Sequence, residues 1–597
     1  MNIMSGCADS LITRDTMIPD LLSQYPKSRS VLDSMGLRGC GGPLGPYETL
    51  GYFARAHGID ESKMLGEIRA VIEGDDSSTA IERTADASPV PGVADTIYRP
   101  YFAAGILTIL TVGATWGAVL LWRIAVGHSF HSAAAMEINA HAQAQVYGWM
   151  GFFIMGFAYQ AFPRFWHSSL VKPRLALIVF SFLFVGVFIG AVSMPFSGYG
   201  EWPAALASCS ALFELIAVVL FTMHLGLTFR ASAAKCEPYI AFIFTALAWF
   251  VLSSVINLCL TFGLMTTTGA ERSFYLDVCQ PILRDMQFHG LGMTMILGVS
   301  LRTLPGLFGL PGVAASRAVA GLALLTAGVA GEIVALAITK LTGFAGAETI
   351  LAIARIAILL SALLVVLPFK LWRTFPEWDR VEKYIRAAYI WLFVSLCMLA
   401  ASPFYAQVSG TPASHAYAGA IRHAITVGFI SLMIMGYSSK VVPTLKGVNP
   451  ATLSPINLPF FLVNLGCALR VILQTGTDWT RACFPLVGIS GSLEVLGIAL
   501  WAIHLLRIGL KKDTHTDQVS SLPRPDKITA DLMVAQVLNW YPQTESIFIS
   551  NGFTALNNPI LRKTVASQVS IERACRMHSV NVEQFLDELN ASIGSQV

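Results

Sequence analysis

The chain has 597 residues, of which 54% are hydrophobic and only 13% are charged. This balance excludes an ordinary soluble protein of this length, because such a surface needs far more charge. The formal net charge of +3 gives no indication of nucleic-acid binding, so nucleic acid is not an expected partner.

Residues 1–75 are polar and charged, and they contain no apolar segment that would indicate a cleavable signal peptide. They predict a small helical domain, followed by a polar, proline-containing linker over 76–98. Within the domain, "GLRGCGGP" places Cys40 in a glycine-rich turn. We expect a structural turn there, with redox sensing or ligand binding as the alternative.

Residues 99–510 contain repeated apolar runs of about 20 residues, the length that crosses a bilayer. They predict an all-α polytopic membrane protein of about 12 transmembrane helices, since a closed strand pattern is not visible. The predicted spans are 101–125, 139–163, 174–195, 203–228, 238–262, 285–308, 313–338, 349–369, 384–408, 415–443, 453–474 and 484–509.

Lysine and arginine set the predicted orientation. They are frequent in the loops after even-numbered spans and rare in the loops after odd-numbered spans. The positive-inside rule then places both termini in the cytoplasm.

Three spans repeat one pattern, G-x7-G-x3-[QRK]-x2-P, at intervals of 142 and 138 residues. The repeat predicts three four-helix pseudo-repeats, with the glycines favouring close helix contact. The long side chains at the third position are expected to extend toward the inner headgroups. The positions are Gly148, Gly156, Gln160, Pro163; Gly290, Gly298, Arg302, Pro305; and Gly428, Gly436, Lys440, Pro443.

Four histidines fall in the outer halves of these three repeat-equivalent helices: His141, His289, His415 and His423. Neutral imidazole is a common ligand of haem iron and metal ions, and polar groups in a bilayer are costly. We therefore predict cofactor or metal binding by these four residues, with interhelical hydrogen bonding as the alternative. Arg422, beside His423, is the candidate partner of a haem propionate.

Buried carboxylates form a second set of candidates. Glu214 and Glu494 occupy matching positions in the first and third repeats. They are candidate catalytic residues that relay protons, or they bond to neighbouring helices. Glu332 and Arg355 are expected to be structural partners.

The end of the chain repeats its beginning. After a linker over 511–526, residues 527–597 predict a second small helical domain, in which Tyr541-Pro542 and Gly552 match Tyr25-Pro26 and Gly36.

The membrane part resembles the NnrS family in "NAHAQAQVYGWMGFFIMGFAYQAFPRF", "FHGLGMTMILGVSLRTLP" and "IRHAITVGFISLMIMGYSSKVVP". This resemblance implies a twelve-helix bacterial membrane protein, associated with haem and copper and linked to nitric oxide metabolism. The bundle is also similar in plan to haem–copper oxidase subunit I. However, the histidine pair expected on its seventh helix is missing, so terminal oxidase activity is not expected. The two end domains look like the DUF1858 or ScdA N-terminal type.

From these features we expect haem b held by His141 and His423, with His289 and His415 near a second haem or a metal such as copper. The expected function is binding of nitric oxide or another diatomic ligand. One alternative is a quinol-linked nitric oxide reductase, an oxidoreductase in which Glu214 or Glu494 moves protons. The other is a transporter or sensor without enzymatic activity, with the end domains as its output.

Overall fold

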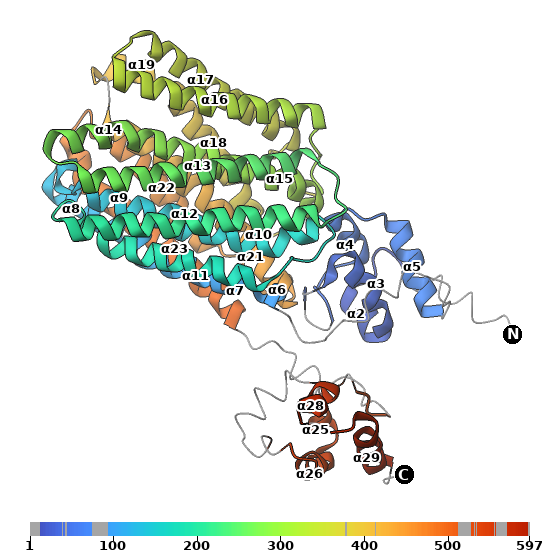
Figure 1. Ribbon diagram of the computed structural model, residues 1–597. Coiled ribbons are helices and arrows are strands. Elements are labelled where there is room, and N and C mark those ends of the chain that lie inside the picture. The colour runs from blue at the N-terminus through green and yellow to red at the C-terminus, as the bar shows by residue number, and fades with distance from the viewer. Residues whose placement is uncertain are drawn as a thin grey trace. The chain divides into compact units, whose positions relative to one another are not determined.

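The computed structural model describes residues 12–38, 40–41, 44–73, 93–376, 379–411, 414–510, 527–530, 532, 534–553, 556, 570–578 and 580–594. The chain forms two compact units. The first contains the N-terminal domain and the helix bundle, and the second contains the C-terminal domain (Figure 1). The described residues are helical, with one isolated bridge between Met17 and Thr49, which confirms the all-α prediction.

The N-terminal domain packs short helices around a small apolar core that includes Leu32 and Phe53. The hydroxyl of Thr49 caps α4 by accepting a hydrogen bond from the backbone of Tyr52. Gly36 has φ 109°, and a side chain there would collide with the ring of His57. The helices are α2 Ile18–Gln24, α3 Arg29–Leu32, α4 Leu50–His57 and α5 Glu61–Glu73.

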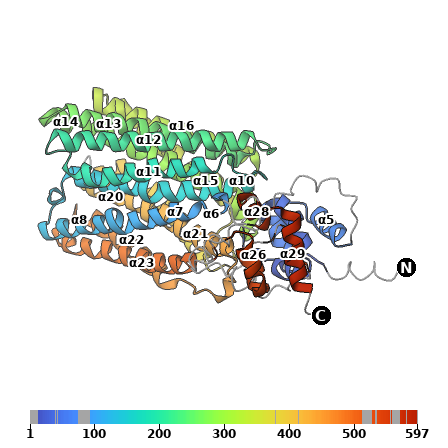
Figure 2. The ribbon, with the colours of Figure 1, turned by 60° about the horizontal axis from the view of Figure 1, so that its bottom comes forward.

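The helices of the bundle run alongside one another in both ribbon views (Figures 1 and 2). They are α6 Val93–Thr96, α7 Tyr98–Thr108, α8 Ala114–Gly127, α9 Ala135–Gln143, α10 Phe152–Phe165, α11 Arg174–Ser193, α12 Glu201–Arg230, α13 Pro238–Thr266, α14 Gly269–Asp285, α15 Thr294–Phe308, α16 Ala315–Thr342, α17 Gly346–Val366, α18 Glu382–Ala400, α19 Ser402–Ser409, α20 His415–His423, α21 Leu432–Lys446, α22 Asn457–Gly476 and α23 Phe484–Leu510.

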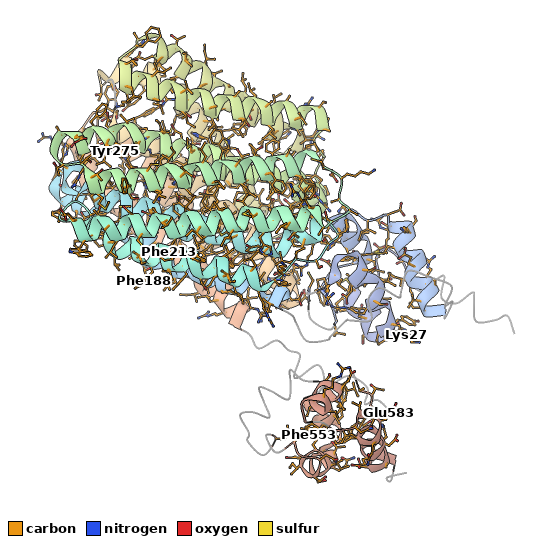
Figure 3. All side chains as sticks on the ribbon, viewed as in Figure 1. Lys27, Phe188, Phe213, Tyr275, Phe553 and Glu583 are labelled. Carbon is orange, nitrogen blue, oxygen red and sulfur yellow. The ribbon has the colours of Figure 1, made fainter. Side chains whose placement is uncertain are left out.

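Eleven helices within the described residues are long and apolar enough to cross a membrane. Apolar side chains such as Phe188, 62% exposed, lie on the outside of the bundle, where lipid would cover them (Figure 3). The predicted span 139–163 is helical, as part of the continuous helix 135–165, but it is not among the eleven. Much of this helix is buried inside the bundle, and its first segment is polar.

A π-helical segment interrupts each of the three repeat-equivalent helices at the same register. The segments are η6 Ala144–Gly151, η8 Met286–Met293 and η10 Ala424–Ser431. In each, the first glycine of the sequence pattern is the fifth residue. A further π segment, η4 Ile109–Gly113, joins α7 to α8. Such segments are rare and concentrate at functional sites, so they indicate a functional site at this depth of the bundle.

The second glycine of each pattern marks a close helix crossing, as predicted. A Cβ atom on Gly156 would lie 2.7 Å from Tyr101, and one on Gly298 would lie 2.6 Å from Phe242. The helices run two or three residues past the pattern's prolines before ending. The glycines therefore serve packing rather than space for a macrocycle.

The N-terminal domain contacts the ends of all three repeat-equivalent helices. Nη2 of Arg164 donates to the carbonyl of Arg38 at 2.7 Å, and Nε of Arg55 donates to the carbonyl of Gly306 at 3.2 Å. We call this the docked end of the bundle and the opposite end the distal end.

The C-terminal unit has the same order of elements as the N-terminal domain. Its core includes Phe548 and Phe585 together with Phe553, which is labelled in Figure 3. Gly552 has φ 92°, at the position that matches Gly36. Its helices are α25 Val534–Trp540, α26 Glu545–Ser550, α28 Ile571–His578 and α29 Val582–Gly594.

Candidate functional site

The clearest cluster of potential cofactor ligands lies in the distal half of the bundle, beside the π segments. His141 comes from α9 and His423 from the end of α20, so two repeat-equivalent helices contribute one histidine each. His141 and His423 lie within electrostatic range of each other, and Arg470 acts on both.

The first helix of the bundle is shaped around His141. Gly113 has ψ −113°, which breaks the helix and frees its carbonyl oxygen, and this oxygen accepts a hydrogen bond from Nδ1 of His141 at 3.0 Å. A Cβ atom on Gly117 would lie 2.5 Å from Cε1 of the same ring. This bond fixes the tautomer that leaves the Nε2 lone pair available, as in histidines that bind metals.

His423 is held less firmly. Its Nδ1 lies 3.0 Å from the carbonyl oxygen of Gly419, one turn earlier on the same helix. This bond also leaves Nε2 as the acceptor atom, but the ring has no anchor on another helix among the described residues. Of the two rings, His141 is therefore the better preorganised.

Three arginines surround the two histidines. Arg422 and Arg470 act electrostatically on His423, and Arg284 acts on His141. Arg470 is 5% exposed, and its Nε and Nη1 atoms have no hydrogen-bond partner among the described residues. Because a buried guanidinium keeps its charge, these orphaned donors indicate that the site is suited to a carboxylate or another anion.

Arg470 and Arg284 were not predicted as site residues. Arg470 lies in the middle of the predicted span 453–474, and an arginine at that depth is a signal that sequence alone could have supplied. Arg284 donates to Oε1 of Gln287 at 2.7 Å and is also buried.

His289 belongs to a different group of side chains. Its Nδ1 faces Oε2 of Glu332 at 3.5 Å, and Asp285 lies one turn earlier on its own helix. Nε of Arg355 donates to Oε1 of Glu332 at 2.9 Å, so the predicted pairing of these two residues is confirmed. His415 is exposed at the distal end, where its ring packs edge-on to Phe130 with centroids 5.4 Å apart.

Glu214 is fully buried between helices. Its Oε2 accepts hydrogen bonds from Gln143 at 2.7 Å and from Asn257 at 3.3 Å. Glu494 lies within electrostatic range of Arg470, and its Oε1 has no partner among the described residues. Both carboxylates thus border the histidine site, and within the described part of the chain hydrogen bonds hold Glu214 in position.

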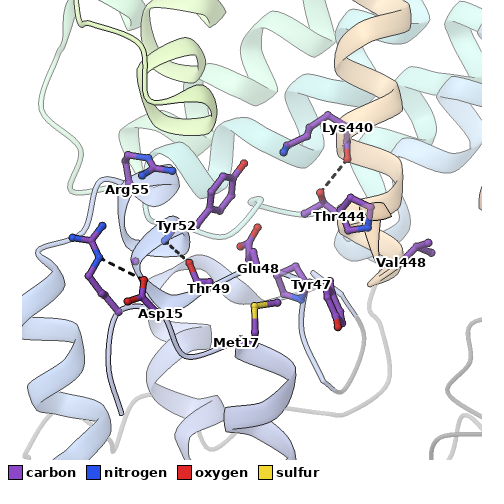
Figure 4. A pocket seen from close by; sticks show the side chains of 14 residues that line it. Asp15, Met17, Tyr47, Glu48, Thr49, Tyr52, Arg55, Lys440, Thr444 and Val448 are labelled. Atoms are coloured by element: carbon purple, nitrogen blue, oxygen red, sulfur yellow. Dashed lines mark hydrogen bonds and ion pairs between the residues drawn. The ribbon is translucent and has the colours of Figure 1, made fainter. Parts of the chain in front are cut away.

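The docked end contains a second polar site, a pocket of about 410 Å³ between the N-terminal domain and α21 (Figure 4). Lys440 pairs with Asp379 at 2.5 Å and lies 5.2 Å from the centre of the Tyr52 ring. Burial raises the pKa of Glu48 to about 7 and that of Tyr52 to about 12. Lys440 is therefore an interface residue rather than one that extends freely to the surface.

Cys40 lies at the same interface, in a turn whose Gly41 amide donates to the carbonyl of Leu445 at 3.2 Å. Burial raises the pKa of the Cys40 thiol, which is opposite to the shift that a reactive thiol needs. This favours the structural interpretation of the turn.

The fold and site define a polytopic helical membrane protein with buried histidines and arginines inside its bundle. The model of the NnrS family (NnrS protein) matches residues 94–512, which is most of the chain, and the chain therefore belongs to the NnrS family. A domain of unknown function, DUF1858, matches residues 528–586 in the C-terminal unit. None of the curated proteins matches this chain.

The DUF1858 match covers the C-terminal domain alone. The N-terminal domain has the same order of elements and a glycine with positive φ at the equivalent position. Its resemblance to DUF1858 therefore rests on sequence and on this shared structure.

Proposed function

We propose that this protein binds haem b in the distal half of its membrane bundle, with Nε2 of His141 as the principal iron ligand and His423 as the second. The observation that supports this proposal is the shape of the first helix, where Gly113 and Gly117 accommodate and orient the His141 ring. When bound, the haem supplies an iron centre that binds nitric oxide or another diatomic ligand.

The surrounding residues fit the carboxylates of such a group. Arg422 was the predicted partner of a propionate, and Arg470 adds two orphaned donors. The weaker hold on His423 would let this side chain move, whereas the anchored His141 would stay in place to hold the haem. We place the chain in the bacterial inner membrane, with the docked end and both termini on the cytoplasmic side.

The first experiment is to purify the full-length protein in detergent under haem-replete conditions. Haem and copper content are measured, with reduced-minus-oxidised spectra before and after addition of nitric oxide. We expect stoichiometric haem with a Soret band that shifts on ligand binding. His141→Ala should lose most haem, His423→Ala should keep haem with an altered spectrum, and His504→Ala serves as the control. Full haem content and unchanged spectra in both site variants would contradict the proposal.

A second candidate is a quinol-linked nitric oxide reductase, favoured by the bond between Gln143 and the buried carboxylate of Glu214. Gln143 stands two residues after His141, so this carboxylate borders the haem ligand. The reductase requires turnover of nitric oxide with a quinol donor and loss of that turnover in Glu214→Gln. A colourless protein would instead favour the transporter or sensor. The involvement of His289 and His415 in a second haem or copper site stays a prediction.

A further inference from the structure

Three side chains outside the His141 and His423 pair converge in the membrane bundle. Asp285 and His289 are one turn apart at the junction of α14 and η8, and Glu332 comes from α16. One donor atom from each residue lies within 4.8 Å of the other two. Donors that bind one metal ion at about 2.0–2.2 Å lie about 3–3.5 Å from one another, so a small inward movement would suffice.

Two atoms of this cluster lack partners. Nδ1 of His289 and Oε2 of Glu332 are 3.5 Å apart, which is too long for a good hydrogen bond. Neither atom has a hydrogen-bond partner among the described residues, although His289 is 3% exposed and Glu332 is fully buried. Buried polar atoms almost always find partners, and a cation bound between these two atoms would satisfy both.

The surroundings orient the carboxylate toward the cluster. Arg355 donates from Nε to Oε1 of Glu332 at 2.9 Å and thereby leaves Oε2 free to face His289. The hydroxyl of Thr294 donates to the carbonyl of His289 at 3.0 Å, five residues back in the π segment. Such outer contacts are typical of metal-binding residues.

We propose that Asp285, His289 and Glu332 form a binding site for one divalent transition-metal ion. The donor set of one imidazole and two carboxylates suits Fe²⁺, Mn²⁺ or Zn²⁺, whereas Cu(I) prefers sulfur ligands. Three protein ligands leave coordination positions for a small molecule. The proposal deepens the prediction that His289 binds a metal and does not require haem at His141.

The competing interpretation is a salt bridge without a metal, in which a protonated His289 faces Glu332. To separate the two, purified full-length protein is stripped with a chelator, incubated with Fe²⁺, Mn²⁺ or Zn²⁺ in turn, desalted and analysed by elemental mass spectrometry. We expect about one equivalent of at least one ion. Less than a tenth of an equivalent of each ion would overturn the proposal.

The test variants are Glu332→Gln and Asp285→Asn, each expected to weaken binding at least about tenfold. Glu137→Gln is the matched control, because Glu137 is a carboxylate of the same bundle that also pairs with an arginine, Arg123, and lies outside the cluster. Asp285→Asn leaves the pair between Glu332 and Arg355 intact, so it decides the question if Glu332→Gln does not fold. Unchanged binding in Asp285→Asn would overturn the proposal.

Haem is measured in the same samples. A metal equivalent without haem would contradict only the haem proposal, whereas haem without the metal would contradict only this one.

Discussion

Gln143 donates a hydrogen bond of 2.7 Å from Nε2 to Oε2 of Glu214 and so joins α9 to α12 inside the bundle. Replacement of Gln143 by leucine leaves the buried carboxylate with only the longer bond from Asn257. We expect the free energy of unfolding to fall by about 1–3 kcal/mol, the cost of an unsatisfied buried group. Unfolding in detergent, followed by circular dichroism, measures the change.

The control is the double variant Gln143→Leu with Glu214→Leu. Removal of both partners should restore part of the lost stability, because no buried acceptor is then left unpaired. Additive losses in the double variant would show that the bond does not matter for stability.

Gly117→Ala tests the space around His141. The new methyl group would lie 2.5 Å from Cε1 of the ring, so the ring must leave its position. We expect haem content to fall by more than half, measured as the pyridine haemochrome per protein. Gly226→Ala is the control, since a Cβ atom there meets nothing within 4 Å. Equal haem in both variants would argue against His141 as the principal ligand.

Arg470→Gln tests the anion-binding side of the site. Loss of a charge-assisted hydrogen bond is worth about 1.5–3 kcal/mol, or roughly a 10–100-fold change in affinity. We expect haem to transfer correspondingly faster to an excess of apomyoglobin. Arg481→Gln changes an exposed arginine and should transfer haem at the original rate. If both variants transfer haem at the rate of the unchanged protein, Arg470 has no part in haem binding.

The docked N-terminal domain should respond to pH through two groups with opposite signs. Burial, with nearby Arg164 and Arg302, lowers the pKa of His57 to about 3. The contribution of His57 to the stability of the docked domain is therefore present above pH 6.5 and is lost as the pH falls toward 3. The pKa of Glu48 is raised to about 7, so its contribution is present below pH 4.5 and is lost as the pH rises toward 7.

Single variants separate these two contributions. In Glu48→Gln only His57 remains, so the domain should dock more tightly as the pH rises from 5 to 6.5. In His57→Asn only Glu48 remains, so the domain should dock less tightly as the pH rises from 5 to 7. Hydrogen exchange of α4, corrected for intrinsic rates, measures docking. The same trend in both variants would contradict the assignment of the two opposite pH effects to His57 and Glu48.

Much of the fold could be predicted because the sequence repeats. The shared glycine and proline pattern predicted close helix contacts, and Gly156 against Tyr101 confirms them. The pair of Glu332 and Arg355 was also predictable, because a charged side chain in a membrane span is costly unless it pairs with an opposite charge.

The rest depended on three-dimensional relations that a sequence pattern does not contain. His141 and His289 lie on repeat-equivalent helices at different registers from the repeated glycine, but the register did not show that His289 lies with Asp285 and Glu332. Arg284 and Arg470 are far apart in sequence and converge only through folding. The docking of the N-terminal domain on Arg164 and Lys440 was not predicted either, because a cation near a helix end usually reaches water.

The three π segments at one register also determine how the protein tolerates changes in chain length. A π segment holds about one more residue per turn than an α-helix, so deletion of one residue from η6 would restore an α-helix while the flanking segments keep nearly the same orientation. The same deletion from the regular helix α10 would rotate everything on its distal side, His141 included, by about 100°. We therefore expect the position of His141 to survive the loss of a residue within 144–151 better than the loss of one within α10.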